Sequence, residues 1–498
     1  MTVRHRIFSL WFLMALLLGA SAWVLAAPGL PSGAGSSLYR VRVAYIIPSD
    51  RQPIARYHTK AGMLLSGIQT FYADQMERNG FGRMTFAYET DSEGLPEVHF
   101  VRSPMTAAEF AGTGHAKYAI GNYWQHTEAA IKAAGFPAYR PGEIWLCIVE
   151  AQDQLPDGSI HNGTSQGNCV FESGMVLCSA DILALADPKL LHDHRSYDGL
   201  IVPEIGPNRL VLHKSFADYE GDAVSSLVAV HIGALAHELG HAFTLQHCYL
   251  NDLNFNGNLM GNSFRRWRGS AMPEQFPNEE TRLDRPSALL LRVNPFFRKP
   301  AERVPEGKPP VVTITAPPGN MPIEGGRFHL PFSASQPGGP GIALAILQCT
   351  EPQDNVGVVA YQEFEGTPSE IANTLETTLV TPGKEQHWTV RVFDKQGRWG
   401  EQTVLLKAPT DGIAAVPFLS IPHTTVKVSE TVKFDAGLSH PGMLRYHWDF
   451  GDGREEDSQI ALHPYKKPGH YNVKLTVRDS AGRYSEGSQF IWVQSAKP

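Results

Sequence analysis

Two histidines and a glutamate within five residues are the groups whose types and spacing most directly predict chemistry. They form the string His237-Glu238-Leu239-Gly240-His241. Residues four apart in a helix lie on one face, one turn apart, so both imidazoles can reach one metal ion. The glutamate that follows the first histidine can hold a water molecule beside that ion. The spacing therefore predicts a hydrolytic zinc site.

The segment that carries this string predicts a buried helix. Residues 225–243 are rich in alanine and leucine and contain no proline, so we expect helix ends near Ala223 and Thr244. His247 can be a third ligand if the helix stops and the chain turns back. In the long form of the motif, HExxHxxGxxH, a glycine makes this turn at positive φ. Here the position is Thr244, for which positive φ is costly, so we expect a differently built turn.

The string HELGHAFTLQH, followed by Asn-Leu-Met-Gly at residues 258–261, resembles the metzincin clan of zinc endopeptidases. The resemblance is local and covers roughly residues 225 to 262. It implies that His237, His241 and His247 bind Zn²⁺. It also implies that Glu238 is the general base and that Met260 belongs to a Met-turn beneath the metal. The implied function is a secreted zinc-dependent endopeptidase that hydrolyses peptide bonds through a zinc-bound water activated by Glu238.

Other residues near the motif leave alternatives open. In a gluzincin a downstream glutamate replaces His247 as ligand, and the candidates are Glu274, Glu279 and Glu280. Cys248 follows His247 directly, but a thiolate beside three histidines would close the position that catalysis requires. The remaining nearby histidines are expected in packed positions or on solvated loops: His192, His194, His213 and His231.

A calcium site is a weaker cofactor hypothesis. Residues 252–257, Asp-Leu-Asn-Phe-Asn-Gly, match the first half of an EF-hand loop that binds Ca²⁺. Position twelve of such a loop supplies a bidentate glutamate, but here it is Ser263. An asparagine-rich turn that leads into Met260 is therefore the favoured interpretation.

The N-terminus has the pattern of a secretory signal peptide. A basic start, Met1 to Arg6, precedes an apolar run from Ile7 to Leu18 and then small residues, so we expect a signal at residues 1–26 with cleavage after Ala26. An uncleaved anchor is the alternative. Beyond the signal no apolar run is long enough to cross a membrane. The expected location is extracytoplasmic, secreted or in the cell envelope.

The cysteines and the net charge of the chain limit which disulfides and partners we expect. Five cysteines in a secreted chain are compatible with disulfides, and Cys169 and Cys178, which flank a short glycine-containing loop, are the best candidate pair. Cys147 lies in an apolar run and is expected to be a buried thiol. The net charge of -7 gives no reason to expect nucleic acid. The expected partner is a protein or peptide substrate.

The length of 498 residues predicts about three domains. The first, 38–300, alternates strand and helix signals and predicts an α/β zincin-like catalytic domain with the active-site helix packed on the sheet. Its expected strands are 41–47, 84–88, 97–101 and 144–149, and its expected helices are 61–78 and 107–134. A Pro-rich linker at 301–310 follows, and then an immunoglobulin-like β-sandwich at 311–409.

The last block, 417–494, carries the strings WDFGDG at 448–453 and GHYNVKLTVRD at 469–479. These strings resemble a PKD domain, an immunoglobulin-like sandwich common on secreted bacterial enzymes. The two all-β sandwiches can bind polysaccharide or protein, or they can be spacers, and the spacer interpretation is favoured. The competing functional class is a secreted adhesin or glycan-binding protein whose zincin-like domain is inactive or structural.

Overall fold

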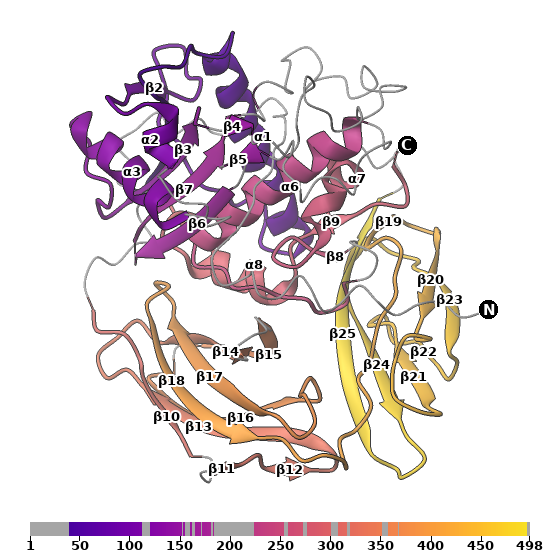
Figure 1. The fold of residues 1–498 in the computed structure, drawn as a ribbon. Helices are drawn as coiled ribbons and strands as arrows, with labels where there is room; N and C mark the ends of the chain where they lie inside the picture. Colours follow the sequence, from indigo (N-terminus) through magenta and orange to yellow (C-terminus); the bar gives the residue numbers. More distant parts are fainter. Residues whose placement is uncertain are drawn as a thin grey trace.

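The structure is a computed structural model in which the chain folds into a mixed α/β part followed by two β-sandwiches (Figure 1). It describes residues 39–111, 120–151, 153–154, 160–161, 165–170, 172–180, 183, 224–252, 257–271, 276–299, 307–315, 319–350, 357–366 and 368–495. The expected signal peptide and most of the expected linker lie outside these residues. So do His192, His194 and His213.

A five-stranded sheet forms the centre of the α/β part, with the order β2-β1-β3-β7-β6. The strands are β2 Val98–Arg102, β1 Arg40–Ile47, β3 Glu143–Val149, β7 Ser173–Ser179 and β6 Ser165–Val170. The first four run parallel, and β6 runs antiparallel to β7. A parallel sheet requires crossover segments that cover its faces, as the alternating strand and helix signals predict.

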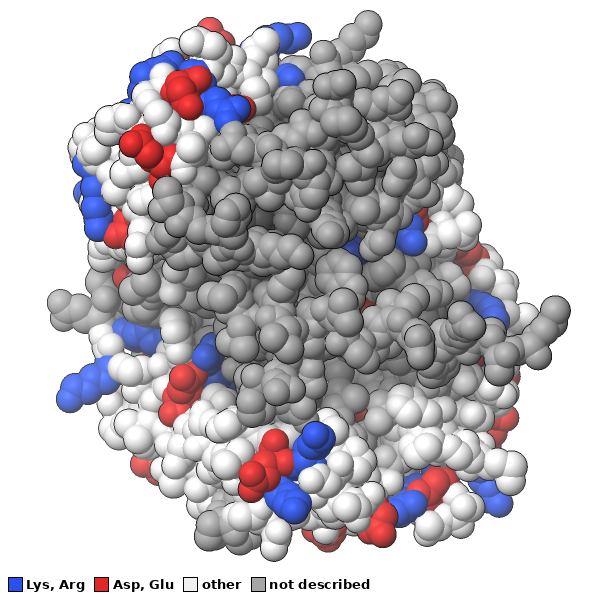
Figure 2. All heavy atoms as spheres, viewed as in Figure 1, with Lys and Arg blue, Asp and Glu red and all other residues white. Residues whose placement is uncertain are grey.

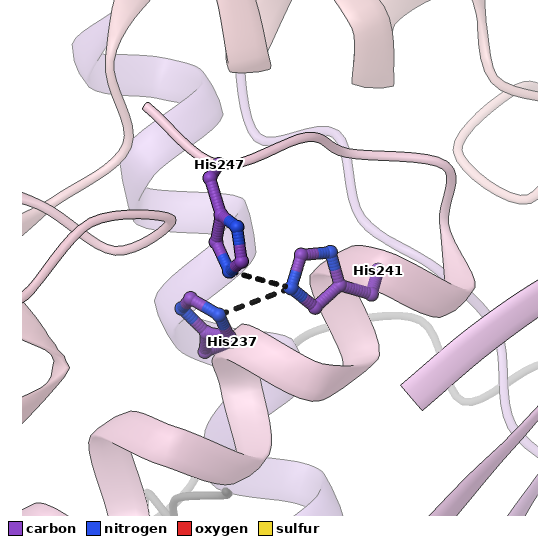
Figure 3. Close-up of side chains that lie close together, drawn as sticks. All are labelled: His237, His241 and His247. Carbon is purple, nitrogen blue, oxygen red and sulfur yellow. Dashed lines mark hydrogen bonds between the residues drawn. The ribbon is translucent and has the colours of Figure 1, made fainter. Parts of the chain in front are cut away.

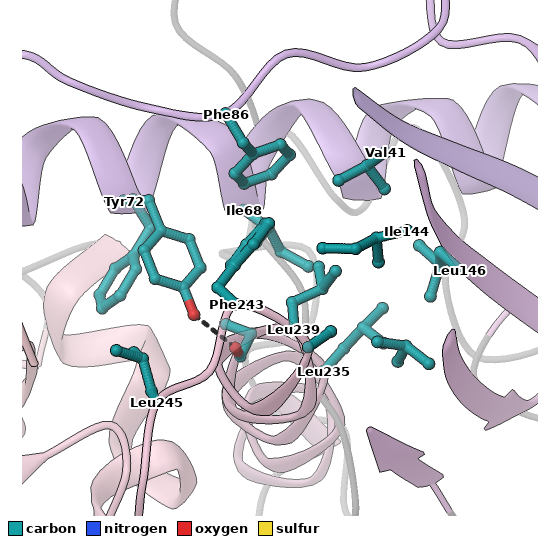
Figure 4. Close-up of a cluster of buried hydrophobic side chains, with 14 of the residues drawn as sticks. Val41, Ile68, Tyr72, Phe86, Ile144, Leu146, Leu235, Leu239, Phe243 and Leu245 are labelled. Carbon is teal, nitrogen blue, oxygen red and sulfur yellow. Dashed lines mark hydrogen bonds between the residues drawn. The ribbon is translucent and has the colours of Figure 1, made fainter. Parts of the chain in front are cut away.

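Helices cover both faces of this sheet. Helices α1 (Tyr57–Arg78) and α6 (Val224–Ala242) lie on one face, and α2 (Ala107–Ala111) and α3 (Ile120–Ala133) lie on the other. Successive side chains of β3 enter different buried clusters because a strand points them to opposite faces. Ile144, Leu146 and Ile148 pack in the cluster of α1 and α6, part of which Figure 4 shows, and Trp145, Cys147 and Val149 pack in that of α3.

Two local expectations are wrong. The expected strand at 84–88 is instead irregular chain that pairs with β1 through a single bridge between Val41 and Tyr88. The expected loop between Cys169 and Cys178 is a β-hairpin of β6 and β7. In its register Cys169 lies opposite Gly174 and Cys178 lies opposite Ser165, so the two thiols are at different levels of the ladder. All five cysteines are thiols, and the expected disulfide is absent from the structure.

Short elements close the α/β part after α6. They are β8 (Gly257–Asn258), the 3₁₀ helix η4 (Ser263–Arg266), α7 (Trp267–Ala271), β9 (Thr281–Arg282) and α8 (Arg285–Val293). Asp284 is the N-cap of α8, where its side chain accepts a 3.0 Å hydrogen bond from the Ser287 amide. A separate hairpin pairs β4 (Asp153–Gln154) with β5 (Ile160–His161).

The first sandwich has two sheets. One has the order β10-β13-β12, with β16 also on β13, and the other has the order β11-β18-β17-β14-β15. The strands are β10 Val311–Ile314, β11 Gly319–Asn320, β12 Ile323–Glu324, β13 Arg327–Ser335, β14 Ile342–Thr350, β15 Val358–Glu363, β16 Glu370–Thr377, β17 Glu385–Asp394 and β18 Trp399–Lys407.

The second sandwich has a five-stranded sheet, β19-β25-β24-β21-β22, and the pair β20-β23. The strands are β19 Thr425–Lys427, β20 Thr431–Asp435, β21 Arg445–Asp449, β22 Glu455–Glu456, β23 Ile460–Pro464, β24 Gly469–Arg478 and β25 Tyr484–Gln494. Both sandwiches agree with the expected all-β blocks.

Charged side chains of both signs alternate over the described part of the face shown in Figure 2. On this face the described residues gather into no extended basic surface. None of the described helices combines the length and the apolar character needed to cross a membrane.

Candidate metal centre

The helix α6 ends at Ala242, and the chain then turns back at Thr244, whose φ is 72°. The Thr244 amide donates to the His241 carbonyl and the Leu245 amide donates to the Gly240 carbonyl, both at 2.9 Å. This pair of bonds is a Schellman motif, which normally places glycine at the positive-φ position. The turn therefore has the positive φ of the long motif, with threonine in place of glycine. Our expectation of a different kind of turn was wrong.

The turn brings His247 back over the two helical histidines (Figure 3). The Nε2 atom of His241 lies 3.1 Å from that of His237 and 3.2 Å from that of His247. One ring nitrogen of each residue lies within 4.8 Å of the other two, and this is the single group of that kind among the described residues. The structure thus brings together the three histidines that the sequence singled out.

Two of these imidazoles are fixed through their other nitrogen. His237 Nδ1 lies 2.7 Å from the Leu259 carbonyl, and His241 Nδ1 lies 3.0 Å from the Leu245 carbonyl. Because a carbonyl oxygen is an acceptor, each Nδ1 carries the proton and donates it. In the neutral ring Nε2 then has a lone pair, and the lone pairs of His237 and His241 face each other. This is the arrangement of metal ligands.

The donor set fits zinc. Zinc–imidazole bonds of about 2.0 to 2.1 Å at tetrahedral angles place ligand nitrogens about 3.3 Å apart, close to the two contacts here. Burial is the main cause that lowers the pKa of His237 well below its ordinary value, and the charges of the other two histidines lower it further. Burial followed by the charge of His241 lowers the pKa of His247 to about 3. Neutral imidazoles are the form that binds metal.

Glu238 lies beside this group on α6 as a buried carboxyl. It is 1% exposed, and its Oε1 atom has no hydrogen-bond partner among the described groups. Burial raises the pKa of Glu238 well above its ordinary value, and a hydrogen bond from the Gly167 amide partly offsets this effect. A buried carboxyl with a strongly perturbed pKa beside a candidate metal site is a candidate functional group.

Strand β6 approaches Glu238 through a glycine that the sequence did not single out. A Cβ atom on Gly167 would lie 2.0 Å from the Glu238 carbonyl oxygen, so any side chain there would displace helix or strand. The signal was present as a lone glycine in a β-strand, which often marks close approach of another backbone. Its partner could not be read from the sequence.

The loop after His247 packs against helix α6. Met260 is buried, and a Cβ atom on Gly240 would lie 2.5 Å from its sulfur, so the Met260 side chain occupies the space that this glycine leaves. Asp252, the first expected calcium ligand, instead accepts the amides of Asn258 at 2.5 Å and Asn262 at 2.9 Å. Burial raises the pKa of Asp252 to about 7. These bonds agree with the favoured asparagine-rich turn.

The alternative ligands have other partners. Glu279 accepts hydrogen bonds from Arg268 at 2.6 and 2.8 Å, and Glu280 accepts one from Arg282 at 2.7 Å. Neither belongs to the histidine group, so the geometry does not support the gluzincin alternative at either glutamate. Glu274 lies outside the described residues. Cys248 and His231 are buried and also lie outside the group.

Two aromatic rings beside the histidines were not found from the sequence. The ring of Phe264 lies edge-on to His237 at 5.4 Å between centroids, and that of Tyr249 lies 5.8 Å from His247. Tyr249 is 39% exposed. An exposed aromatic ring beside the candidate metal centre is available to contact a substrate.

Comparison with known proteins identifies the last block. Residues 415–493 match the PKD domain family, which confirms the PKD domain expected at 417–494. The chain is 41% identical to collagenase ColA of Clostridium perfringens over 78 residues, 15% of this chain and 7% of that protein. It is also 34% identical to human polycystin-1 over 92 residues, 18% of this chain and 2% of that protein. The chain therefore spans a small fraction of these relatives.

A wider similarity is found among solved structures. OgpA of Akkermansia muciniphila matches with a TM-score of 0.50 and 16% sequence identity, over 76% of this chain and 95% of OgpA. At this identity the match shows that the two proteins share a fold. Because it covers 76% of this chain, it extends far beyond the PKD domain at residues 415–493.

Proposed function

We propose that the chain is a secreted zinc-dependent endopeptidase of the metzincin type. In this proposal His237, His241 and His247 bind Zn²⁺, and Glu238 is the general base. The observation that carries it is the convergence of three imidazole nitrogens beside a buried carboxyl on the same helix. The α/β layers with α6 packed on the sheet agree with a zincin-like catalytic domain.

Each group of the site has its own role in the proposed hydrolysis. Zinc, when bound, supplies a Lewis acid that polarises the scissile carbonyl and makes water a stronger nucleophile. Glu238 takes the proton of the attacking water and delivers it to the leaving amine. Leu259 and Leu245 hold the two helical imidazoles in the tautomer that binds metal.

The comparisons support a peptide substrate in part. The collagenase match is short, and polycystin-1 matches over a similar length. We therefore do not propose collagen as the substrate of this chain. The solved structures include an inactive OgpA in complex with an O-glycopeptide substrate, at 15% identity to this chain. The shared fold motivates a test of both plain and O-glycosylated peptides. The metal-site geometry supports hydrolysis of the peptide bond in either substrate.

The test separates metal binding from catalysis. Glu238→Gln should keep stoichiometric zinc and lose about 10² to 10⁴-fold in turnover, since a general base contributes an effect of this size. Zinc is measured by elemental analysis, and turnover is measured on denatured casein and on an O-glycopeptide. His247→Ala should lose zinc, while Glu279→Gln, which weakens a nearby ion pair, should keep it.

Two outcomes contradict the proposal. Near wild-type turnover by Glu238→Gln would exclude this glutamate as the base. A wild-type chain that binds zinc but cleaves neither substrate would favour the competing class, an adhesin with an inactive zincin-like domain.

A further inference from the structure

The third histidine of the metal centre is in direct backbone contact with the first sandwich. The Val358 amide, at the start of β15, donates a 2.8 Å hydrogen bond to the His247 carbonyl. The preceding residue is Gly357, where a Cβ atom would lie 1.6 Å from the same carbonyl oxygen. A glycine is therefore required for the two backbones to approach this closely.

The residues on both sides of His247 also contact the sandwich. The side chain of Gln348 on β14 donates a 3.2 Å hydrogen bond to the side chain of Gln246. The Cys248 thiol is buried and lies 3.8 Å from the Val358 carbonyl. Three consecutive residues thus meet β14 and β15, and this segment lies along the sandwich much as an added strand lies along a sheet edge.

This support differs from that of the other two histidines. His237 and His241 lie on α6, and their Nδ1 atoms donate to carbonyls of the α/β part itself. His247 follows the end of α6 by five residues and has no helix to fix its backbone. Its imidazole can approach the others if the turn at Thr244 and the contact with β15 hold the chain in place.

We infer that the edge of the first sandwich is part of the metal centre, with Gly357 and Val358 as positioning residues for His247. The sandwich acts on the site through the backbone of the third ligand. Partners that orient metal ligands commonly change metal affinity by 10- to 100-fold when they are altered. The inference rests on the metal site of the proposed function but does not require peptide hydrolysis.

The test is the zinc affinity of the full chain with Gly357→Ala, measured by competition with a chromogenic chelator. The added methyl group must push His247 away, so we expect zinc affinity to fall by about 10- to 100-fold. Replacement of zinc by Co²⁺ gives a second readout. The visible absorption of bound Co²⁺ depends on ligand geometry and should change in Gly357→Ala.

A matched control lies on the same strand. Glu363 on β15 pairs with Arg292 at 2.7 Å and with Arg285 at 3.3 Å across the same interface, without touching His247. Glu363→Gln should lower the melting temperature slightly and leave zinc affinity and the Co²⁺ spectrum unchanged. Equal losses of affinity in both variants would show that the interface acts through general stability, which would overturn the inference.

A second variant decides the case if Gly357→Ala does not fold. Gln348→Leu removes the bond to Gln246 at nearly constant volume and should lower zinc affinity by about 2- to 10-fold, less than the loss of a closer ligand partner. Wild-type affinity in this variant, or in a folded Gly357→Ala, would overturn the inference. A wild-type chain that binds no zinc would instead contradict the proposed function.

Discussion

The two sandwiches are attached to the α/β part in different ways. Four buried residues of the first sandwich, Leu344, Ile346, Val358 and Phe393, belong to the same hydrophobic cluster as α1 and α6. The PKD domain has its own closed cluster, around Trp448 and Phe450, with no member from the α/β part. Strands β14 and β15 contact α8 (Figure 1).

Polar contacts attach the PKD domain. Thr424 donates a 2.7 Å hydrogen bond to the buried Glu280 carboxylate and accepts one from Arg78. His470 Nε2 donates a 2.9 Å hydrogen bond to the Glu77 carbonyl, and Asn251 Nδ2 donates one of 3.2 Å to the Ser488 carbonyl. A shared apolar core makes two domains fold together, while a polar interface resembles a transient one.

The difference corrects the spacer interpretation for the first sandwich. A spacer domain makes few contacts with the domain that it displaces, but this sandwich supplies core residues and a backbone partner of His247. The PKD domain remains compatible with a spacer or a binding module. Similar sequence patterns therefore describe two domains with different physical roles.

Truncation gives the largest expected effect. A chain that ends at residue 306 lacks the four core residues of the first sandwich, so we expect an exposed apolar face, poor solubility and loss of zinc binding. A chain that ends at residue 411 lacks the PKD domain and should keep stoichiometric zinc. Zinc content and thermal unfolding measure both. Full zinc affinity in the shorter chain would remove the distinction between the sandwiches.

Thr424→Val tests the polar attachment and should have an intermediate effect. The substitution keeps the volume but leaves the buried Glu280 and Arg78 one partner short, at a cost of about 1 to 3 kcal/mol. Because the contact lies in the PKD interface, zinc affinity should not change. Thr424→Ser keeps the hydroxyl and is the control. Denaturant unfolding gives the free energy, and a drop in zinc affinity would show that the PKD domain also supports the metal centre.

Thr244→Gly gives the smallest expected effect and has the opposite sign. Threonine at φ of 72° is strained, and glycine adopts this conformation freely. Loss of this strain, partly offset by the greater freedom of glycine in the unfolded chain, should stabilise the protein by up to about 1 kcal/mol. Zinc affinity should be equal or higher, because His247 keeps its partner Val358. Destabilisation would show that the threonine side chain, and not the turn alone, supports the site.

The sequence by itself determined the parts that depend on local spacing. Two histidines four apart on an apolar, proline-free segment must share a helix face, so His237 and His241 could be predicted from chain geometry. Strand and helix periodicity predicted the α/β layers, and the strings at 448–453 and 469–479 predicted the PKD domain. The offset of His247 also suggested a ligand, although the cost of positive φ at Thr244 argued for a different turn.

Tertiary structure decided everything that depends on contacts between distant segments. Hairpin register separated Cys169 from Cys178, and arginine partners occupied Glu279 and Glu280. In the sequence nothing distinguishes Gly167 and Gly357 from other glycines. Only the fold shows that their backbones lie against those of Glu238 and His247. Cys248 and Val358 are 110 residues apart in the chain, yet they lie in contact. No local pattern encodes such a pair, because its stability comes from burial of apolar surface that distant segments of the chain form together.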